Sequence, residues 1–165
     1  MKIGRKILTV VICMLIVAST LVGCDFLLAK DKEFSTSGMT ITLTTAFSEK
    51  SYIGYTAYYQ SFDVLVFVLK EEKTTFPEDY RDMTVAEYAE LLCGVNSVES
   101  NVMTVGNYAQ FSYTAEISGE VYYYYARCYK TADSFWMIQF ACFNSDAGKL
   151  SAKINKWADT ISFGD

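Results

Sequence analysis

The chain has 165 residues with 19 acidic and 14 basic side chains, a net charge of −5, and no histidine. This balance disfavours nucleic-acid binding, because that affinity comes mainly from basic side chains that neutralise phosphates. Without histidine, a Ser-His-Asp triad, most zinc sites and the usual general base at neutral pH are excluded. Apolar residues make up 52% of the chain and proline occurs once, a composition typical of one well-packed domain.

Residues 1–23 have the pattern of an export signal. Basic residues stand at its start, and the apolar run over 7–18 has the length of a signal-peptide core and is short for a bilayer span. The Leu-Val-Gly-Cys of residues 21–24 resembles the lipobox of bacterial lipoproteins. The resemblance implies that the Cys24 sulfur receives diacylglycerol before a signal peptidase cuts just ahead of it.

A lipid on Cys24 predicts how the chain is held at a membrane. Two fatty acyl chains, palmitate for example, anchor a protein firmly where one chain is only marginal. An uncleaved span from Ile7 to Val22 or beyond is the alternative, and either anchor places the domain on the extracytoplasmic face of the cell membrane. Residues 24–33 then form a short linker and 34–165 the domain. Cleavage of the signal leaves 11 basic against 19 acidic side chains, a net charge of −8.

The first part of the domain predicts two kinds of strand. Residues 39–44 alternate apolar and hydroxyl side chains, the pattern of a strand with one buried face, and Ser37-Gly38 can turn the chain back toward Phe34. Residues 64–69 are apolar at every position, so we expect this strand at the centre of a sheet with both faces covered. Residues 55–60 are its expected hairpin partner.

A helix is predicted from Thr84 to about Cys93. Thr84 and Glu87 have the spacing of a capping box, in which each side chain satisfies a free backbone N–H group of the other residue. Gly94 is expected to end the helix in a left-handed conformation. Four residues form its apolar stripe: Val85, Tyr88, Ala89 and Leu92.

The remaining elements are a meander and a second helix. Strands are predicted over 108–117, 120–129 and 135–143, joined by a Ser118-Gly119 turn and a longer turn over 131–134. Apolar residues recur at helical spacing over 146–159, which indicates an amphipathic helix. Ile161 and Phe163 close the chain as an expected edge strand.

Both faces of the meander carry apolar residues, and two amphipathic helices are available to cover them. The predicted fold class is therefore α+β, an antiparallel β-sheet sandwiched by helices. The stretch 34–47 resembles the opening F-x-x-x-G-h-x-I-x-L-P-x-x-F of PsbP-like domains, with Thr44 in place of the proline, through Phe34, Gly38, Met39, Ile41, Leu43 and Phe47. Resemblance to the PsbP-like and DcrB-like domains implies an α/β/α sandwich and an accessory or assembly role without an active site.

Besides Cys24, the domain contains Cys93, Cys128 and Cys142, without C-x-x-C spacing, so neither a disulfide framework nor a metal cluster is predicted. The expected register sets Cys128 opposite Met137 and Cys142 opposite Tyr123. That places the two thiols on opposite faces of the sheet, beyond disulfide reach, although a shift of one residue in the longer turn would reverse this. We interpret all three as buried thiols that act as small hydrophobic groups.

Acidic residues crowd the expected loop over 71–82: Glu71, Glu72, Glu78, Asp79 and Asp82. Carboxylates can bind Ca²⁺, but the spacing fits no EF-hand loop. A glycosidase carboxylate pair is another hypothesis, which needs a separation that sequence does not give. We favour a solvated charged loop, with no metal and no cofactor.

Aromatic residues gather in the meander. Alternation sends two rings of Tyr122–Tyr125 to each face of the sheet, which favours core packing over a stacking platform for sugars. In the expected register Tyr108, Tyr129 and Trp136 form a cross-strand row, our candidate for an exposed aromatic patch and binding surface. The last helix has a basic face, interpreted as solvated, with contact to anionic lipid or an acidic partner as the alternative: Lys149, Lys153 and Lys156.

Three functional hypotheses remain. The first is a membrane-anchored, non-catalytic lipoprotein that binds another protein or helps to assemble it. The second is a surface receptor for a small ligand or glycan that uses an aromatic pocket. The third and weakest is a histidine-free carboxylate hydrolase. A resemblance of fold does not by itself choose among them.

Overall fold

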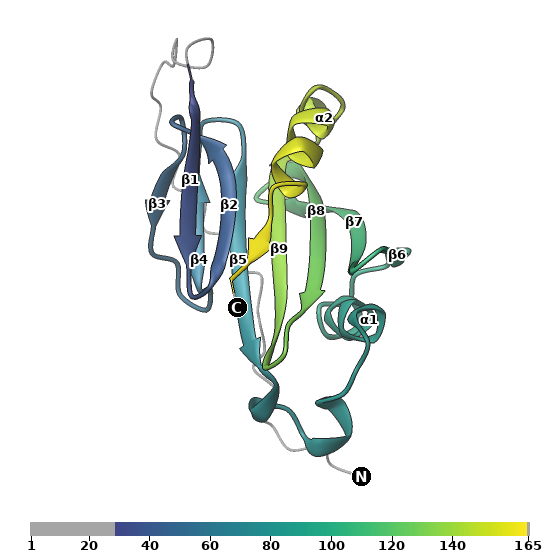
Figure 1. Cartoon of the computed structure of the whole chain (residues 1–165). Coiled ribbons are helices and arrows are strands. Elements are labelled where there is room, and N and C mark those ends of the chain that lie inside the picture. Colours follow the sequence, from purple (N-terminus) through teal and green to yellow (C-terminus); the bar gives the residue numbers. More distant parts are fainter. Residues whose placement is uncertain (1–28, 165) are drawn as a thin grey trace.

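The computed structural model describes residues 29–164, which form two antiparallel β-sheets and two α-helices (Figure 1). The predicted signal peptide 1–23 and Cys24 lie outside the described residues. None of the helices in the described part of the chain is long and apolar enough to cross a membrane.

The small sheet has the strand order β1-β2-β10. Its strands are β1 (Asp31–Thr36), β2 (Met39–Thr44) and β10 (Ser162–Phe163). Ser37 and Gly38 form the turn between β1 and β2, and Phe34 lies opposite Ile41 as expected. The alternating pattern of 39–44 is confirmed, since Met39, Ile41 and Leu43 are fully buried.

The large sheet has the strand order β3-β4-β5-β9-β8-β7-β6, with every neighbouring pair antiparallel. Its strands are β3 (Ser48–Lys50), β4 (Ala57–Gln60), β5 (Leu65–Glu72), β6 (Met103–Val105), β7 (Tyr108–Ile117), β8 (Glu120–Lys130) and β9 (Ser134–Phe143). The apolar strand β5 lies between β4 and β9 with both faces covered, as predicted, but its expected place at the centre of the sheet is wrong. The central position itself belongs to β9.

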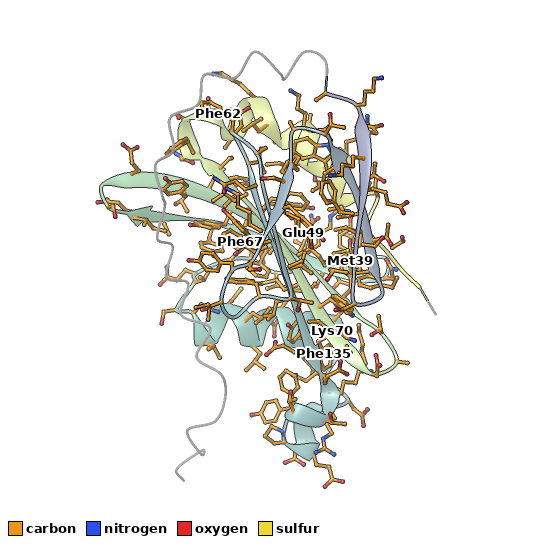
Figure 2. The ribbon with its side chains drawn as sticks, turned by 90° about the vertical axis from the view of Figure 1, so that its left-hand side faces the viewer. Met39, Glu49, Phe62, Phe67, Lys70 and Phe135 are labelled. Atoms are coloured by element: carbon orange, nitrogen blue, oxygen red, sulfur yellow. The ribbon has the colours of Figure 1, made fainter. Side chains whose placement is uncertain are left out.

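Each face of the large sheet has its own cover (Figure 1). On one face α1 (Val85–Val95) packs over Cys128, Phe135 and Met137. On the other face α2 (Ala147–Ala158) and the small sheet enclose the main core around Val66, Ile138 and Phe140. Figure 2 labels Met39, which belongs to this main core, and Phe67 of β5, which belongs to a cluster on the opposite face of the large sheet. The predicted α+β sandwich is confirmed, and the small sheet is an additional layer beside α2.

Short 3-10 turns join some of these elements: η2 (Lys73–Thr75), η3 (Glu78–Tyr80) and η4 (Asn144–Asp146). The C-terminal helix is tied to the small sheet beyond its last turn. Thr42 N–H donates to the Thr160 hydroxyl at 2.9 Å, and Phe47 packs edge-on against Trp157 with 5.1 Å between ring centroids.

The capping box of α1 is confirmed, but its predicted end is wrong. Thr84 Oγ1 accepts from Glu87 N–H at 3.2 Å, and Glu87 Oε2 accepts from Thr84 N–H at 2.7 Å. Gly94 lies inside the helix, and Ser97 takes the left-handed conformation with φ 54°. The helix ends around Ser97, where Val98 N–H donates to Cys93 O at 2.9 Å and Ser97 N–H to Gly94 O at 3.2 Å, which satisfies carbonyls of the last turn.

Candidate functional site

The outer edge of β7 extends beyond its neighbour, the short strand β6. Strand β6 pairs only with Tyr108–Gln110, whereas β7 continues to Ile117. Over 111–117 the strand is therefore hydrogen-bonded on one side, by β8, and within residues 29–164 no strand pairs with its other side. Edges of this kind are templates for pairing with another chain.

Two tight hairpins fix which residues direct their backbone groups outward. A two-residue turn places its flanking residues in a hydrogen-bonded pair, as Ile117 with Glu120 and Val105 with Tyr108. Because such pairs alternate along an antiparallel ladder, odd-numbered residues of β7 bond to β8. Even-numbered residues, Thr114 and Glu116 among them, direct their N–H and C=O groups toward the open edge.

A side-chain hydrogen bond supports the outward direction of the even-numbered residues, at the end of the open edge nearest β6. Ser100 Oγ donates to the Ser112 carbonyl at 2.8 Å, which requires that carbonyl to point away from β8. Among the described residues, no hydrogen bond occupies the outward backbone groups of Thr114 and Glu116. The available stretch thus begins just beyond the Ser100 contact and ends at the Ser118-Gly119 turn.

A groove of about 720 Å³ follows this edge. One wall is the loop of residues 96–99 after α1, and the other consists of residues 112–117 of β7 with Tyr123 and Tyr124. We call it the β7 groove. Its charged lining residues are Glu99 and Glu116, so the β7 groove is acidic.

The groove wall is held rigidly by aromatic packing. Tyr113 stacks on Tyr124 with 4.7 Å between ring centroids and 10° between planes. Gln139, which is 1% exposed, donates to the Tyr113 hydroxyl at 2.8 Å. Burial raises the pKa of Tyr113 well above its usual range, so this phenol stays protonated and keeps its own proton to donate.

The predicted aromatic row exists but is not an exposed patch. Tyr108, Tyr129 and Trp136 lie opposite one another in the expected register. Tyr129 and Trp136 are only 5% and 2% exposed, because Phe163 of β10 packs over both rings at 5.1 and 5.2 Å. The expectation of exposure is therefore wrong, since the last strand returns over this part of the sheet.

The Tyr122–Tyr125 run packs as predicted. Tyr122 and Tyr124 belong to the cluster around Phe67 on the α1 side of the sheet, and Tyr125 belongs to the core on the α2 side. Tyr123 is half-buried and reaches the β7 groove. The interpretation as core packing is confirmed for three of the four rings.

The acidic residues do not form one loop. Glu71 and Glu72 are the last residues of strand β5, and Glu78 and Asp79 lie in η3. Glu71 accepts from the Tyr88 hydroxyl at 2.8 Å, and burial raises the pKa of its carboxyl group. Within residues 29–164, no group of three or more histidine, cysteine or acidic side chains is arranged to hold a metal ion.

The cysteine register is confirmed. Cys128 lies opposite Met137 under α1, and Cys142 lies opposite Tyr123 on the α2 side. Cys93, Cys128 and Cys142 are all buried free thiols. Burial raises the pKa of Cys142 to about 11, which keeps it protonated and unreactive at neutral pH.

The basic face of α2 is solvated as expected. Its three lysines, Lys149, Lys153 and Lys156, are exposed. Lys149 forms an ion pair with Asp146 at 3.1 Å within the same helix region. Pairs this exposed contribute little to stability, so the lysines are best understood as surface charge.

Comparison with known proteins identifies solved structures with the same fold. No family model and no curated protein matches the sequence. Among solved structures, cyanobacterial PsbP (CyanoP) from Synechocystis sp. PCC 6803 matches with a TM-score of 0.53 and 11% identity over 89% of this chain and 98% of that chain. The PsbP-like fold predicted from residues 34–47 is thereby confirmed.

Two further structures share the arrangement. The Ran-binding protein Mog1p of Saccharomyces cerevisiae matches with a TM-score of 0.53 and 8% identity, over 83% of this chain and 97% of that chain. A protein of Bacteroides thetaiotaomicron matches with a TM-score of 0.56 and 12% identity, over 81% of this chain and 48% of that chain. At these identities the likeness shows the fold alone.

Proposed function

We propose that this chain is a lipid-anchored, non-catalytic module that binds a partner protein outside the cytoplasm, through strand addition to the open edge of β7. The observation that carries the proposal is the free pair of outward residues, Thr114 and Glu116, beside a groove wide enough for a segment of chain. An extended peptide that pairs with an edge gains main-chain hydrogen bonds, and its alternate side chains supply specificity.

The groove also defines the chemistry of the partner. On the α1 side an added strand would run beside Tyr113, Ala115 and Ile117, which favours apolar residues at alternate positions. On its other side it would lie beside Thr114 and Glu116. Opposite-charge pairs across strands are favourable, so we expect lysine or arginine mixed with hydroxyl residues at the intervening positions. The partner segment is thus an extended, basic, amphipathic strand.

The anchor belongs to the same proposal. Strand β1 begins at Asp31, before the predicted end of the linker at residue 33, so diacylglycerol on Cys24 would hold the domain within about seven residues of the lipid, a reach of at most roughly 25 Å. The order of a basic start, an apolar core and Leu-Val-Gly-Cys supports it. Intact mass spectrometry of the protein extracted from its own membranes tests this part. A chain that still begins at Met1 with an unmodified Cys24 would overturn it.

Strand addition is tested with a short capped peptide in which valine alternates with lysine and threonine, titrated into the full-length protein in detergent. We expect saturable binding that Thr114→Pro weakens by about tenfold or more, because the substitution removes an outward N–H group. Methylation of the peptide's alternate backbone nitrogens should have a similar effect.

Thr104 of β6 provides a matched control for Thr114→Pro. Thr104 is an exposed residue on the outer edge of β6, outside the β7 groove. Thr104→Pro should leave peptide affinity unchanged, and both variants should retain the wild-type unfolding midpoint within a few degrees. Equal affinity of wild type and Thr114→Pro would contradict strand addition at this edge, as would an equal loss in Thr104→Pro.

A further inference from the structure

A second concavity lies on the other face of the sheet, beside α2. It has a volume of about 230 Å³, and its floor is formed by β7 and β8. Residues 151–155 of α2 form one wall, and Asn101 and Met103, just before and within β6, form the other. We call it the α2 cup. It shares with the β7 groove only Ser112 and Tyr123 among its lining residues.

The lining of the α2 cup is polar and uncharged. It presents the side-chain amides of Asn101, Gln110 and Asn155. It also presents the hydroxyl groups of Ser112, Tyr123 and Ser151, whereas the Tyr125 hydroxyl already bonds to Gln110 and Arg127. Apolar contact surface comes from the tyrosine rings and from Met103 and Ile154, whereas the Phe111 side chain packs on the α1 side of the sheet. A charged ligand would find no counter-ion among these residues.

Existing hydrogen bonds show which groups remain for a ligand. The Tyr125 hydroxyl donates to Gln110 Oε1 at 2.7 Å, so the Gln110 amide nitrogen remains as a donor. Asn155 Nδ2 donates to Ser151 O at 3.0 Å, so the Asn155 amide oxygen remains as an acceptor. The cup therefore offers donors and acceptors side by side, without net charge.

The floor of the cup is fixed by a buried arginine beside it, on the same face of β8. Arg127, 4% exposed, donates from Nε to the Tyr125 hydroxyl at 2.7 Å and from Nη2 to Asp159 at 2.7 Å. Its guanidinium lies over the Tyr108 ring, 4.4 Å from the centroid. A charged donor strengthens the hydrogen bond that it makes and orients the Tyr125 and Gln110 groups before any ligand arrives.

We propose that the α2 cup binds one unit of a neutral carbohydrate. Each sugar hydroxyl both donates and accepts, which matches the mixed lining, and the C–H face of a sugar ring packs against tyrosine. Pockets for drug-sized ligands have volumes of about 300 to 1,000 Å³, so the cup's smaller volume fits a single ring. This site shares only Ser112 and Tyr123 with the β7 groove, and none of its lining residues belongs to the buried row of Tyr108, Tyr129 and Trp136.

Saturation-transfer NMR on the full-length protein tests the inference, in a detergent whose headgroup is not a sugar. Glucose, galactose, N-acetylglucosamine and maltose serve as probes. We expect saturable, millimolar binding of at least one of them. Ser151→Trp, which fills the cup from α2, should abolish that binding, and Gln110→Leu should weaken it about tenfold by removing the free amide donors.

Ala152→Trp is the matched control. Ala152 is the next residue on the same helix, exposed like Ser151 but outside the cup lining. The Ala152→Trp variant should bind the sugar with the affinity of the wild type. No saturable binding of any probe to the wild type, or a signal that survives Ser151→Trp, would overturn the carbohydrate site. Peptide binding at the β7 edge, measured in the same variants, should be unchanged and keeps the two proposals separate.

Discussion

Arg127 is a buried, charged side chain whose hydrogen bonds hold the polar groups beneath α2 in place. Burial alone would lower its pKa, but its hydrogen bonds to Tyr125 and Asp159 raise the pKa above the ordinary arginine range, so the side chain stays charged. Its partner Asp159 is 66% exposed at the side chain, which screens the ion pair. The main contribution of Arg127 is therefore to satisfy and hold the tyrosine hydroxyls beneath α2.

We expect Arg127→Met to lower the free energy of unfolding by about 1–3 kcal/mol, because it leaves the Tyr125 hydroxyl without its donor. Urea unfolding monitored by tyrosine and tryptophan fluorescence measures this change. Arg81→Met is the control, since Arg81 is exposed and should cost within about 0.5 kcal/mol. Equal losses in both variants would show that Arg127 has no special role in the core.

Glu71 makes a prediction about pH. Burial raises the pKa of Glu71 above its ordinary value of 4.5, although the Tyr88 hydroxyl opposes this shift. The folded state thus binds the proton more tightly than the unfolded state, so stability decreases as the pH rises from 4.5 through the folded-state pKa. Glu71→Gln, which can still accept from Tyr88, should reduce this loss and be more stable than the wild type at pH 7.

Unfolding curves of the wild type and Glu71→Gln, measured from acid to neutral pH, test this predicted pH dependence of stability. A steeper loss of stability in Glu71→Gln than in the wild type would reverse the sign that we expect. Glu72→Gln serves for comparison. The Glu72 carboxylate lies at the exposed end of the same strand, paired with Lys70 at 3.0 Å.

Local sequence patterns predict where α1 begins but not where it ends. Thr84 and Glu87 predict its start because the two capping partners are three residues apart. Its end depends on Asn96 and Ser97, and serine rarely adopts the left-handed conformation that glycine accepts readily. Gly94 was the natural candidate for that conformation, but it lies one turn too early.

The position of Gly94 gives a stability prediction. Gly94 is helical, and a Cβ atom placed there would have no heavy atom within 4 Å. Gly94→Ala should therefore stabilise the protein by about 0.5–1 kcal/mol. Gly119→Ala should destabilise it, because Gly119 has φ 84° in the β7–β8 turn. Thermal unfolding of the two variants gives the comparison, and destabilisation by Gly94→Ala would mean that this glycine ends the helix after all.

The strands show a similar division. Alternation and turn residues predict β2, the bounds of β7 and the register that places Cys128 opposite Met137. They do not predict that β10 pairs with β2 across more than a hundred residues of chain, as Phe163 with Met39. That distant pairing buries Tyr129 and Trp136. The open edge of β7 was missed for a related reason, since it depends on how short β6 is, and Met103–Val105 carries no strong strand pattern.

At the scale of the whole molecule, protected and unprotected edges differ. The opposite edge of the large sheet, β3, is short, exposed and charged through Glu49 and Lys50. In the small sheet, the edge strand β1 carries Asp31, Lys32 and Glu33. Short length and charge are the usual protection against edge-to-edge pairing. The stretch Tyr113–Ile117 has one charge, no proline and no lysine, so it is the edge suited to a partner.

Residue-resolved amide exchange by NMR on the lipidated protein in micelles tests this central claim. In the free protein, Tyr113 and Ala115 should exchange slowly because they bond to β8, whereas Thr114 and Glu116 should exchange fast. Addition of the alternating valine and lysine peptide should slow Thr114 and Glu116 and leave their odd-numbered neighbours unchanged. Slow exchange at all four positions in the free protein, or no change at Thr114 and Glu116 when peptide is bound, would contradict strand addition at this edge.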